Sequence, residues 1–221
     1  MGKTNKSVTR LVTSGILIGL AVVLSMIKVY ELPYGGSVTL FSMVPIVILG
    51  YTYGTKWGLL CGTIYAVLQA LLGATMSQAF AGVEGFNVVL MCLLDYILAF
   101  TVLGLGGVFK IVIKNNKLLS LILGGFLAGV LRFVCHFLSG YLLWGGYAEW
   151  YFGENMNNDF GTSILNSFSG EGLAAIYSLI YNGSYMIFEI AITIVGLLVL
   201  FSVKPIRNII CEDNRNIKAK N

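Results

Sequence analysis

The chain has 221 residues, of which 57% are hydrophobic and 11% are charged, and its mean hydropathy is +0.84. A typical soluble domain is about half apolar and about a quarter charged, so this composition excludes an ordinary water-soluble globular protein. Several apolar stretches are long enough to cross a hydrocarbon layer of about 30 Å at about 1.5 Å per residue. We therefore expect an all-α integral membrane protein.

Six apolar segments are predicted as transmembrane helices in one compact bundle, a single membrane domain over residues 1–221. The predicted spans are 11–28, 38–53, 57–74, 87–113, 118–144 and 174–203. Lys56, together with Gly50 and Gly54, separates the second span from the third. The first segment lacks a small-residue cleavage site and is followed by further spans, so we read it as a retained helix and not a signal peptide.

Lysine and arginine are distributed unevenly between the two sides of the predicted bundle. If the N-terminus is inside, Lys28 is the basic residue outside and Arg132 is the one within a span, so the remaining twelve of the fourteen lie on the inner side. Short inner loops carry an excess of positive charge, which predicts that both termini are cytoplasmic. The net charge of +4 is spread over separate loops and tails and so argues against a nucleic-acid-binding function.

Metal, disulfide and catalytic motifs are missing from the sequence. Four cysteines lie in predicted helices or the inner tail without CxxC or other metal-ligand spacing, so we expect no disulfide, no metal site and no cofactor. There is one histidine, no HExxH motif and no GxxxxGK[ST] phosphate loop. An intramembrane enzyme would need paired catalytic groups, and it is retained as the alternative from a different functional class.

Two connections on the outer side are candidate lids. Residues 145–172 form a long, polar loop with aromatic residues, which we interpret as a partly ordered lid, with a tolerated insertion as the alternative. In the first outer connection, Pro33, Gly35 and Gly36 favour a turn over a continuous helix.

Strongly polar side chains occur within three of the predicted spans, and such residues by default mark a site. Asp95, His136 and Asn182 each lie eight residues from the outer end of their span, which corresponds to a depth of about 12 Å. We therefore predict that they face one pocket in the outer half of the bundle. A carboxylate, an imidazole and a carboxamide can together orient a heterocycle with donors and acceptors.

Two helix faces extend this polar layer. The fifth span carries polar, small and aromatic residues at steps of four, and the sixth carries a similar face: Arg132, His136, Gly140 and Trp144, and then Ser178, Tyr181, Asn182, Tyr185 and Glu189. Gly140 would leave room for a flat ring on which Trp144 could stack. Three structural alternatives stay open: an Arg132–Glu189 ion pair, His136 bonding only across helices, and Trp144 as a membrane-interface residue.

Gly15 and Gly19 form a small-xxx-small pair in the first span, which allows a second helix to approach closely. The pair could serve packing within the chain or an interface with a partner protein.

A resemblance to a known family is carried by the stretches GGSVTL, LLDYILAFTVLGLGGVF, RFVCHFLSGYLLWGGYAEW and IYSLIYNGS. Over nearly all of its length the chain resembles the thiamine-specific substrate-binding subunits of energy-coupling-factor transporters. The resemblance implies a bacterial-type, multi-pass protein of the cell membrane that binds thiamine near the outer face and catalyses nothing itself. It also implies docking on one transmembrane coupling protein and two ATPase subunits.

The family's motifs carry over to particular residues of this sequence. The matching ligand-binding positions are Asp95 and Tyr96, then Arg132, His136, Gly140 and Trp144, then Tyr177, Ser178 and Asn182. The small pair Gly15 and Gly19 matches the site that meets the coupling protein.

The chain departs from the family pattern in two respects. It has Asp95 and Arg132 where a family member has glutamate and lysine, so the acid is shorter by about one methylene. Where that member has a tryptophan in the first outer loop that closes over the ligand, this chain has Tyr34, Gly35 and Gly36. Tyr34 or the aromatic residues of the long outer loop are the candidate replacements.

The sequence therefore favours a thiamine-capturing subunit of an ATP-driven uptake system. The alternatives are a subunit for another vitamin or a thiamine precursor, and, from another class, a passive membrane scaffold, which the polar layer disfavours.

Overall fold

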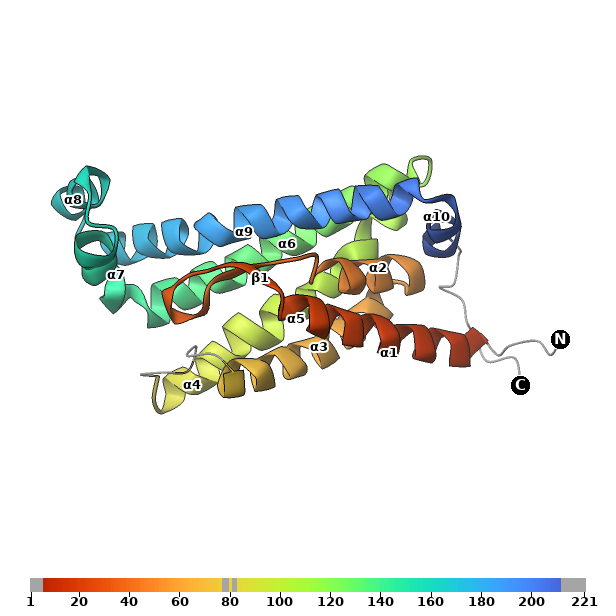
Figure 1. Ribbon diagram of the computed structural model, residues 1–221, viewed down its shortest axis with the longest axis horizontal. Coiled ribbons are helices and arrows are strands. Elements are labelled where there is room, and N and C mark those ends of the chain that lie inside the picture. The colour runs from red at the N-terminus through yellow and green to blue at the C-terminus, as the bar shows by residue number, and fades with distance from the viewer. Residues whose placement is uncertain (1–5, 77–79, 81–82, 212–221) are drawn as a thin grey trace.

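The computed structural model describes residues 6–76, 80 and 83–211. Its long helices run side by side in an elongated bundle (Figure 1). Within this part of the chain, five helical segments are long and apolar enough to cross a membrane: Lys6–Ser25 (α1), Thr55–Thr75 of α3 (Thr55–Met76), Phe86–Lys110, Lys117–Leu143 (α6) and Gly170–Ser202 (α9). The prediction of a helical, multi-pass membrane protein is confirmed.

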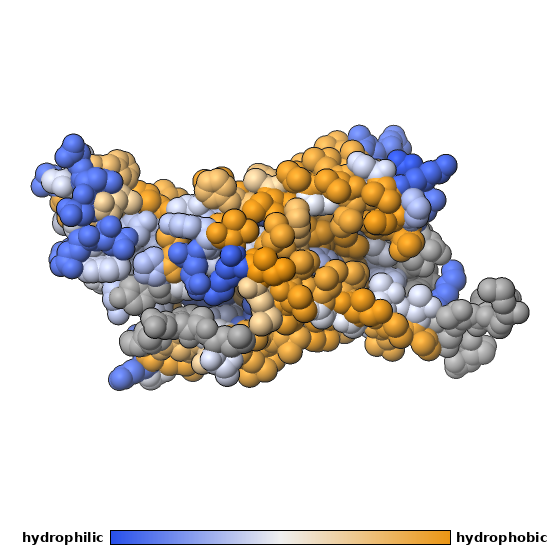
Figure 2. Space-filling model, viewed as in Figure 1, coloured by the Kyte–Doolittle hydropathy of each residue, from blue (hydrophilic) through white to orange (hydrophobic). Residues whose placement is uncertain are grey.

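On the face shown in Figure 2, apolar side chains cover most of the middle of the molecule, whereas hydrophilic side chains gather at its two ends and in one patch left of the centre. On α1, for example, Leu11 is 61% exposed, Ile16 64% and Val23 57%. Such a surface would be costly in water, at about 25 cal/mol per Å², but it is the surface that contacts lipid tails in a bilayer.

The second predicted span, 38–53, is shorter in the structure than the sequence suggested. Its helix is Val44–Tyr53 (α2), with Pro45 in the first turn and Gly54 at the C-terminal end, where φ is +91°. All ten residues are buried. The uninterrupted run of apolar residues in this segment therefore reflects burial among other helices and not contact with lipid along a full span. A helix of this length rises about 15 Å and cannot cross the membrane by itself.

The fourth predicted span, 87–113, is one helical segment of changing pitch. It consists of Phe86–Met91 (α4), a π-helical stretch Cys92–Leu98 (η2), Ala99–Thr101 (α5) and a 3₁₀ stretch Val102–Lys110 (η3). π-Helical turns are rare and occur often at functional sites. Asp95 and Tyr96 lie in this one.

The first outer connection is a β-hairpin and not only a turn. Lys28–Glu31 (β1) pairs antiparallel with Ser37–Thr39 (β2), and a short 3₁₀ helix, Pro33–Gly35 (η1), joins them. The hairpin lies along the bundle beside α9 (Figure 1). The hairpin is a small departure from the all-α expectation. The predicted second span had assigned residues 38–39 to a helix, whereas they belong to β2.

The long outer segment 145–172 is ordered and largely helical, where the sequence suggested a partly ordered lid. It contains Gly145–Tyr147 (η4), Ala148–Trp150 (α7), Tyr151–Asn155 (η5) and Asp159–Ser167 (α8). Asn158 caps α8, since its side-chain oxygen accepts a hydrogen bond from the Gly161 N–H at 2.9 Å. Phe152 is fully buried and Tyr151 nearly so, which anchors the segment to the bundle.

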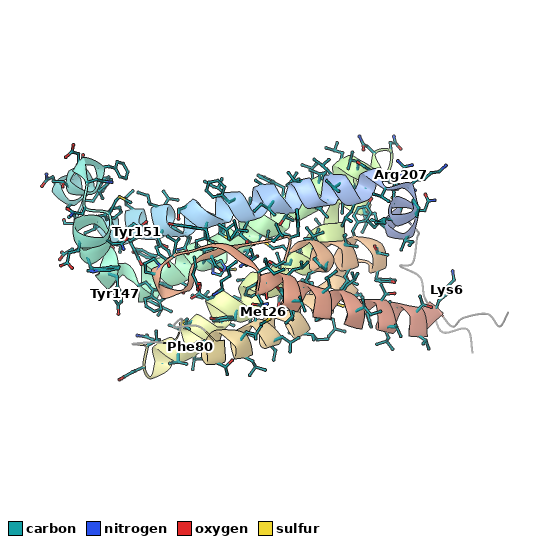
Figure 3. All side chains as sticks on the ribbon, viewed as in Figure 1. Lys6, Met26, Phe80, Tyr147, Tyr151 and Arg207 are labelled. Carbon is teal, nitrogen blue, oxygen red and sulfur yellow. The ribbon has the colours of Figure 1, made fainter. Side chains whose placement is uncertain are left out.

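Both ends of the described chain lie at the same end of the bundle. Lys6 of α1 and Arg207 of Lys204–Cys211 (α10) are at one end, and Tyr147 and Tyr151 are at the other (Figure 3). This arrangement places the N- and C-terminal helices together on the side that the charge distribution predicts to be cytoplasmic.

Candidate functional site

A cavity of about 410 Å³ lies between the helices and the β-hairpin. Residues from α1, the hairpin, α3, η2, α6 and α9 line it, so every wall comes from a different part of the sequence. Its volume falls within the range of about 300–1,000 Å³ that is usual for small-molecule sites. The cavity is therefore the candidate ligand site.

The three residues predicted to share a depth come together at this cavity. The Asp95 Oδ1 and His136 Nδ1 atoms are 2.9 Å apart, and the Asn182 Nδ2 donates to the His136 backbone carbonyl at 3.1 Å. All three line the cavity. The side-chain layer predicted from helix positions is thus present in the structure.

The hydrogen bonds of His136 determine which of its nitrogens carries the proton. The Arg132 Nε–H donates to His136 Nε2 at 3.2 Å, so Nε2 must be the unprotonated acceptor. Nδ1 therefore carries the hydrogen and donates it to Asp95. The arrangement corresponds to a neutral imidazole held in one tautomer.

Arg132 forms the ion pair that was one of two alternatives for it. Its Nη1 atom lies 3.2 Å from Glu189 Oε2, and both side chains are buried. The guanidinium also lies over the Phe100 ring, 4.5 Å from its centroid. Arg132 nevertheless lines the cavity, so the ion pair and a place beside a ligand coexist.

Asp95 has no cationic partner within this network. Its Oδ2 accepts a hydrogen bond from the Ser139 hydroxyl, and its Oδ1 accepts one from the neutral His136. Arg132 is paired with Glu189, and Lys28, the other cationic residue lining the cavity, is paired with Glu31. Among the described residues, the cavity therefore keeps one uncompensated negative charge.

Gly140, Trp144 and Tyr177 also line the cavity, whereas Ser178 does not. The Ser178 hydroxyl donates to the Phe137 carbonyl at 2.6 Å and also accepts from Asn182 Nδ2 at 3.1 Å. Ser178 therefore lies behind the wall and orients Asn182.

The π-helical stretch brings Tyr96 into the cavity wall beside Asp95. The Tyr96 ring stacks on Phe80, with centroids 5.6 Å apart, and on Phe100 at 6.3 Å. A Cβ on Gly73 of α3 would lie 2.1 Å from the Tyr96 hydroxyl, so this glycine makes room for it. Tyr96 is thereby fixed by neighbours on two sides.

The hairpin turn covers part of the cavity. Gly36 is buried and lines it, and the Gly36 N–H donates to the Tyr181 hydroxyl at 3.2 Å. That hydroxyl in turn donates to the Pro33 carbonyl. Of the two predicted lid residues, Gly36 is thus at the cavity, whereas the Tyr34 side chain lies outside the part of the chain that the structure describes.

Several lining residues were not among the site residues predicted from the sequence. Tyr181 and Tyr185 lie on the polar face of α9 that the sequence revealed, but they were not assigned to the ligand. Tyr65 and Gln69 come from α3, from which no candidate was drawn. Gln69, a carboxamide within an apolar span, was the available signal, and its Nε2 donates to Ser25 Oγ at 2.7 Å.

No three His, Cys, Asp or Glu side chains are grouped to hold a metal ion within the described ranges.

The sequence model of the thiamine transporter protein family matches residues 11–154, which is more than half of the chain. The chain belongs to this family. It is 28% identical over 211 residues to the thiamine transporter ThiT of Bacillus subtilis, covering 91% of this chain and 94% of that protein. It is 26% identical over 204 residues to ThiT of Lacticaseibacillus paracasei, covering 88% and 84%.

A solved structure of ThiT from Listeria monocytogenes has the same fold. The two structures agree with a TM-score of 0.66 at 22% sequence identity, covering 93% of this chain and 99% of that one. Membership of the family and the apolar helices together make this chain a bacterial multi-pass membrane protein.

Proposed function

We propose that this protein captures thiamine from outside the cell in the cavity beside Asp95, as the substrate-binding subunit of an energy-coupling-factor uptake transporter. Membership of the thiamine transporter family supports the solute. The observation that carries the proposal is the uncompensated carboxylate of Asp95 in a cavity lined with aromatic rings.

The charge of the cavity matches the charge of thiamine. The thiazolium ring of thiamine is a permanent cation, and Asp95 supplies the negative charge that the described ion pairs leave uncompensated. Trp144, Tyr177 and Tyr181 line the same cavity. Aromatic faces attract a desolvated cation by about 2 kcal/mol or more.

The hydrogen-bonding capacity of the polar layer matches the other half of thiamine. Both His136 nitrogens are occupied, and the Asn182 amide donates within the protein. Asn182 Oδ1 accepts one bond, from Tyr185 at 2.9 Å, and so keeps a second lone pair, as do both Asp95 oxygens. The layer thus offers free hydrogen-bond acceptors, to which the amino group of an aminopyrimidine can donate.

Transport would need partners that supply energy. The sequence has no phosphate loop for ATP, so we assign ATP hydrolysis to two ATPase subunits and the mechanical step to a transmembrane coupling protein. A Cβ on Gly15 or Gly19 would meet nothing within 4 Å in the described chain. Packing among the described residues therefore does not use the pair, and we assign it to the coupling-protein interface. The subunit itself is non-enzymatic.

Isothermal titration of the purified, folded protein with thiamine tests the proposal. We expect binding at submicromolar concentrations, and Asp95→Asn should weaken it by about tenfold to a hundredfold because a charge-assisted contact is lost. Asp159→Asn, the same change at the exposed start of α8, is the matched control and should bind as the wild type does. Absence of binding at micromolar thiamine would contradict the proposal.

A competition series identifies the ligand within the same class. Thiamine phosphates, the pyrimidine moiety, riboflavin and biotin are added against bound thiamine. The alternative of a precursor or another vitamin predicts that one of them displaces thiamine at a lower concentration than thiamine itself.

A further inference from the structure

Glu189 is the most completely buried acid of α9, with 2% of its surface exposed, and it does not itself line the cavity. Its Oε2 pairs with the Arg132 guanidinium at 3.2 Å. Its Oε1 accepts hydrogen bonds from the backbone N–H and the hydroxyl of Thr39, the second of these at 2.7 Å. One carboxylate therefore connects α6 with the last residue of β2.

On the α6 side, Glu189 acts on His136 through Arg132. The Arg132 guanidinium uses Nη1 for Glu189 and Nε for His136. Because the Nε–H donates to His136 Nε2, the orientation of Arg132 selects the tautomer that directs Nδ1–H toward Asp95. A shift of Arg132 would leave the imidazole free to take the other tautomer.

On the hairpin side, Glu189 fixes the base of β2. The hydroxyl of Thr39 gives its proton to Glu189, so the Ser42 hydroxyl, 2.6 Å away, must donate to Thr39. The other end of the hairpin is held by Tyr181, which bonds to Gly36 and Pro33. The hairpin is thus attached to α9 at two places, at Tyr181 and at Glu189. The attachment at Glu189 also includes the ion pair with Arg132.

We propose that Glu189 is a positioning residue that couples the seating of the hairpin over the cavity to the tautomer of His136 and hence to the donor that faces Asp95. This inference rests on the proposed function for its ligand, thiamine. It predicts that loosening the carboxylate frees both the hairpin and the imidazole, so that a bound ligand leaves faster.

A neutral isostere separates this role from simple filling of space. In Glu189→Gln one oxygen becomes an NH₂ group, which is a donor and cannot accept from Arg132 or from Thr39. In either orientation of the amide the pairing with Arg132 loses its charge, and one of the two attachments also loses its acceptor, while the shape is kept. Thr39→Val is the milder second variant, because it removes the hydroxyl and leaves the backbone N–H and the ion pair in place.

The first measurement uses the fact that the chain has one histidine. Protein labelled with ¹⁵N-histidine gives a single imidazole, whose ¹⁵N chemical shifts identify the protonated nitrogen without any ligand. We expect Nδ1–H in the wild type and in Thr39→Val. In Glu189→Gln we expect a mixture of tautomers.

The second measurement is the rate at which bound thiamine dissociates, followed by chase with unlabelled thiamine. We expect Glu189→Gln to raise this rate by about tenfold or more and Thr39→Val by about fivefold, since hydrogen bonds to a charged group are lost. Glu154→Gln on the exposed outer segment and Thr63→Val, whose hydroxyl lies 3.1 Å from that of Thr101, are the matched controls. Both should dissociate at the wild-type rate.

The outcomes distinguish the inference from the proposed function. A folded Glu189→Gln protein that keeps either the wild-type imidazole spectrum or the wild-type dissociation rate overturns the coupling. If Glu189→Gln does not fold, an unchanged dissociation rate in Thr39→Val overturns it. If the wild type binds no thiamine, the proposed function fails, and the ligand-free imidazole spectrum still decides whether Glu189 sets the tautomer.

Discussion

Asn182 shows how closely the polar side chains of the site depend on one another. Its amide donates to the His136 carbonyl and to Ser178, and its oxygen accepts from Tyr185. These bonds fix which way the carboxamide faces, since its NH₂ group is held between His136 of α6 and Ser178 of α9. The oxygen that remains for a ligand is therefore preorganised, which reduces the cost of ordering it on binding.

Gly140 is the position where a small substitution should disturb this arrangement most. A Cβ there would lie 2.3 Å from Ser178 Oγ and 2.7 Å from Asn182 Nδ2. We expect Gly140→Ala to force Asn182 away from His136 and to raise the dissociation constant for thiamine by about tenfold or more, as measured by isothermal titration.

Gly183→Ala is the matched control for Gly140→Ala. It adds the same methyl group beside Asn182, but a Cβ at Gly183 meets no atom within 4 Å in the described structure. It should leave thiamine affinity within about twofold of the wild type. Equal affinities in the two variants would show that Asn182 does not need its present position.

The sequence could identify the residues of this layer because depth in a helix follows from residue number. A constant rise of about 1.5 Å per residue places Asp95, His136 and Asn182 at one level. It does not give the rotation of each helix, so it could not decide which side chains pair. The structure shows Asp95 bonded to His136 and Ser139, and Arg132 bonded to Glu189.

At the scale of elements, the largest departures from prediction occur where hydropathy does not determine backbone shape. The hydrophobic run that predicted a span from residue 38 to residue 53 contains a strand, a bend and the short helix α2. The π-helical pitch of η2 likewise leaves no periodic signal over seven residues. The strand β2 and the π-helical stretch η2 both contribute residues to the cavity wall. Here the packing of the site determines the backbone conformation more than the local sequence preference does.

The outer helical segment supports the cavity wall from behind. Tyr151 of η5 contacts Tyr177 and Tyr181 edge to face, with centroids 5.3 and 5.7 Å away. Burial and the nearby Tyr30 raise the pKa of the Tyr151 phenol, so it stays neutral well into the alkaline range. The sequence suggested a lid here, whereas the structure gives the segment a buttressing position.

Tyr151→Ala should weaken thiamine binding through that wall. Aromatic pairs contribute about 0.5–1.5 kcal/mol each beyond their buried area, so loss of two pairs should raise the dissociation constant by about fivefold to a hundredfold. Tyr151→Phe keeps both ring contacts and should bind nearly as the wild type does. Phe160→Ala, an aromatic truncation at a position that is 53% exposed, controls for general effects on the segment.

At the scale of the whole molecule, composition and charge predicted most of the architecture. The helical bundle, its apolar surface and the shared location of Lys6 and Arg207 follow from hydropathy and from the distribution of basic residues. The number of full spans could not be predicted in this way. A helix such as α2, buried by its neighbours, is as apolar as one that faces lipid.

The outward-facing glycines of α1 allow a test of the proposal that this molecule works as one subunit of a larger transporter. Gly15 and Gly19 lie one helical turn apart, and no described atom of the chain occupies the space beside them. A leucine at each place should block the close approach of a partner helix while leaving the distant cavity intact.

We expect Gly15→Leu/Gly19→Leu to bind thiamine with wild-type affinity and to lose thiamine uptake in cells and copurification with the coupling protein. The control Gly183→Leu changes another open glycine, on α9, and should retain both thiamine uptake and copurification. Uptake that continues in the double variant would place the coupling-protein interface elsewhere.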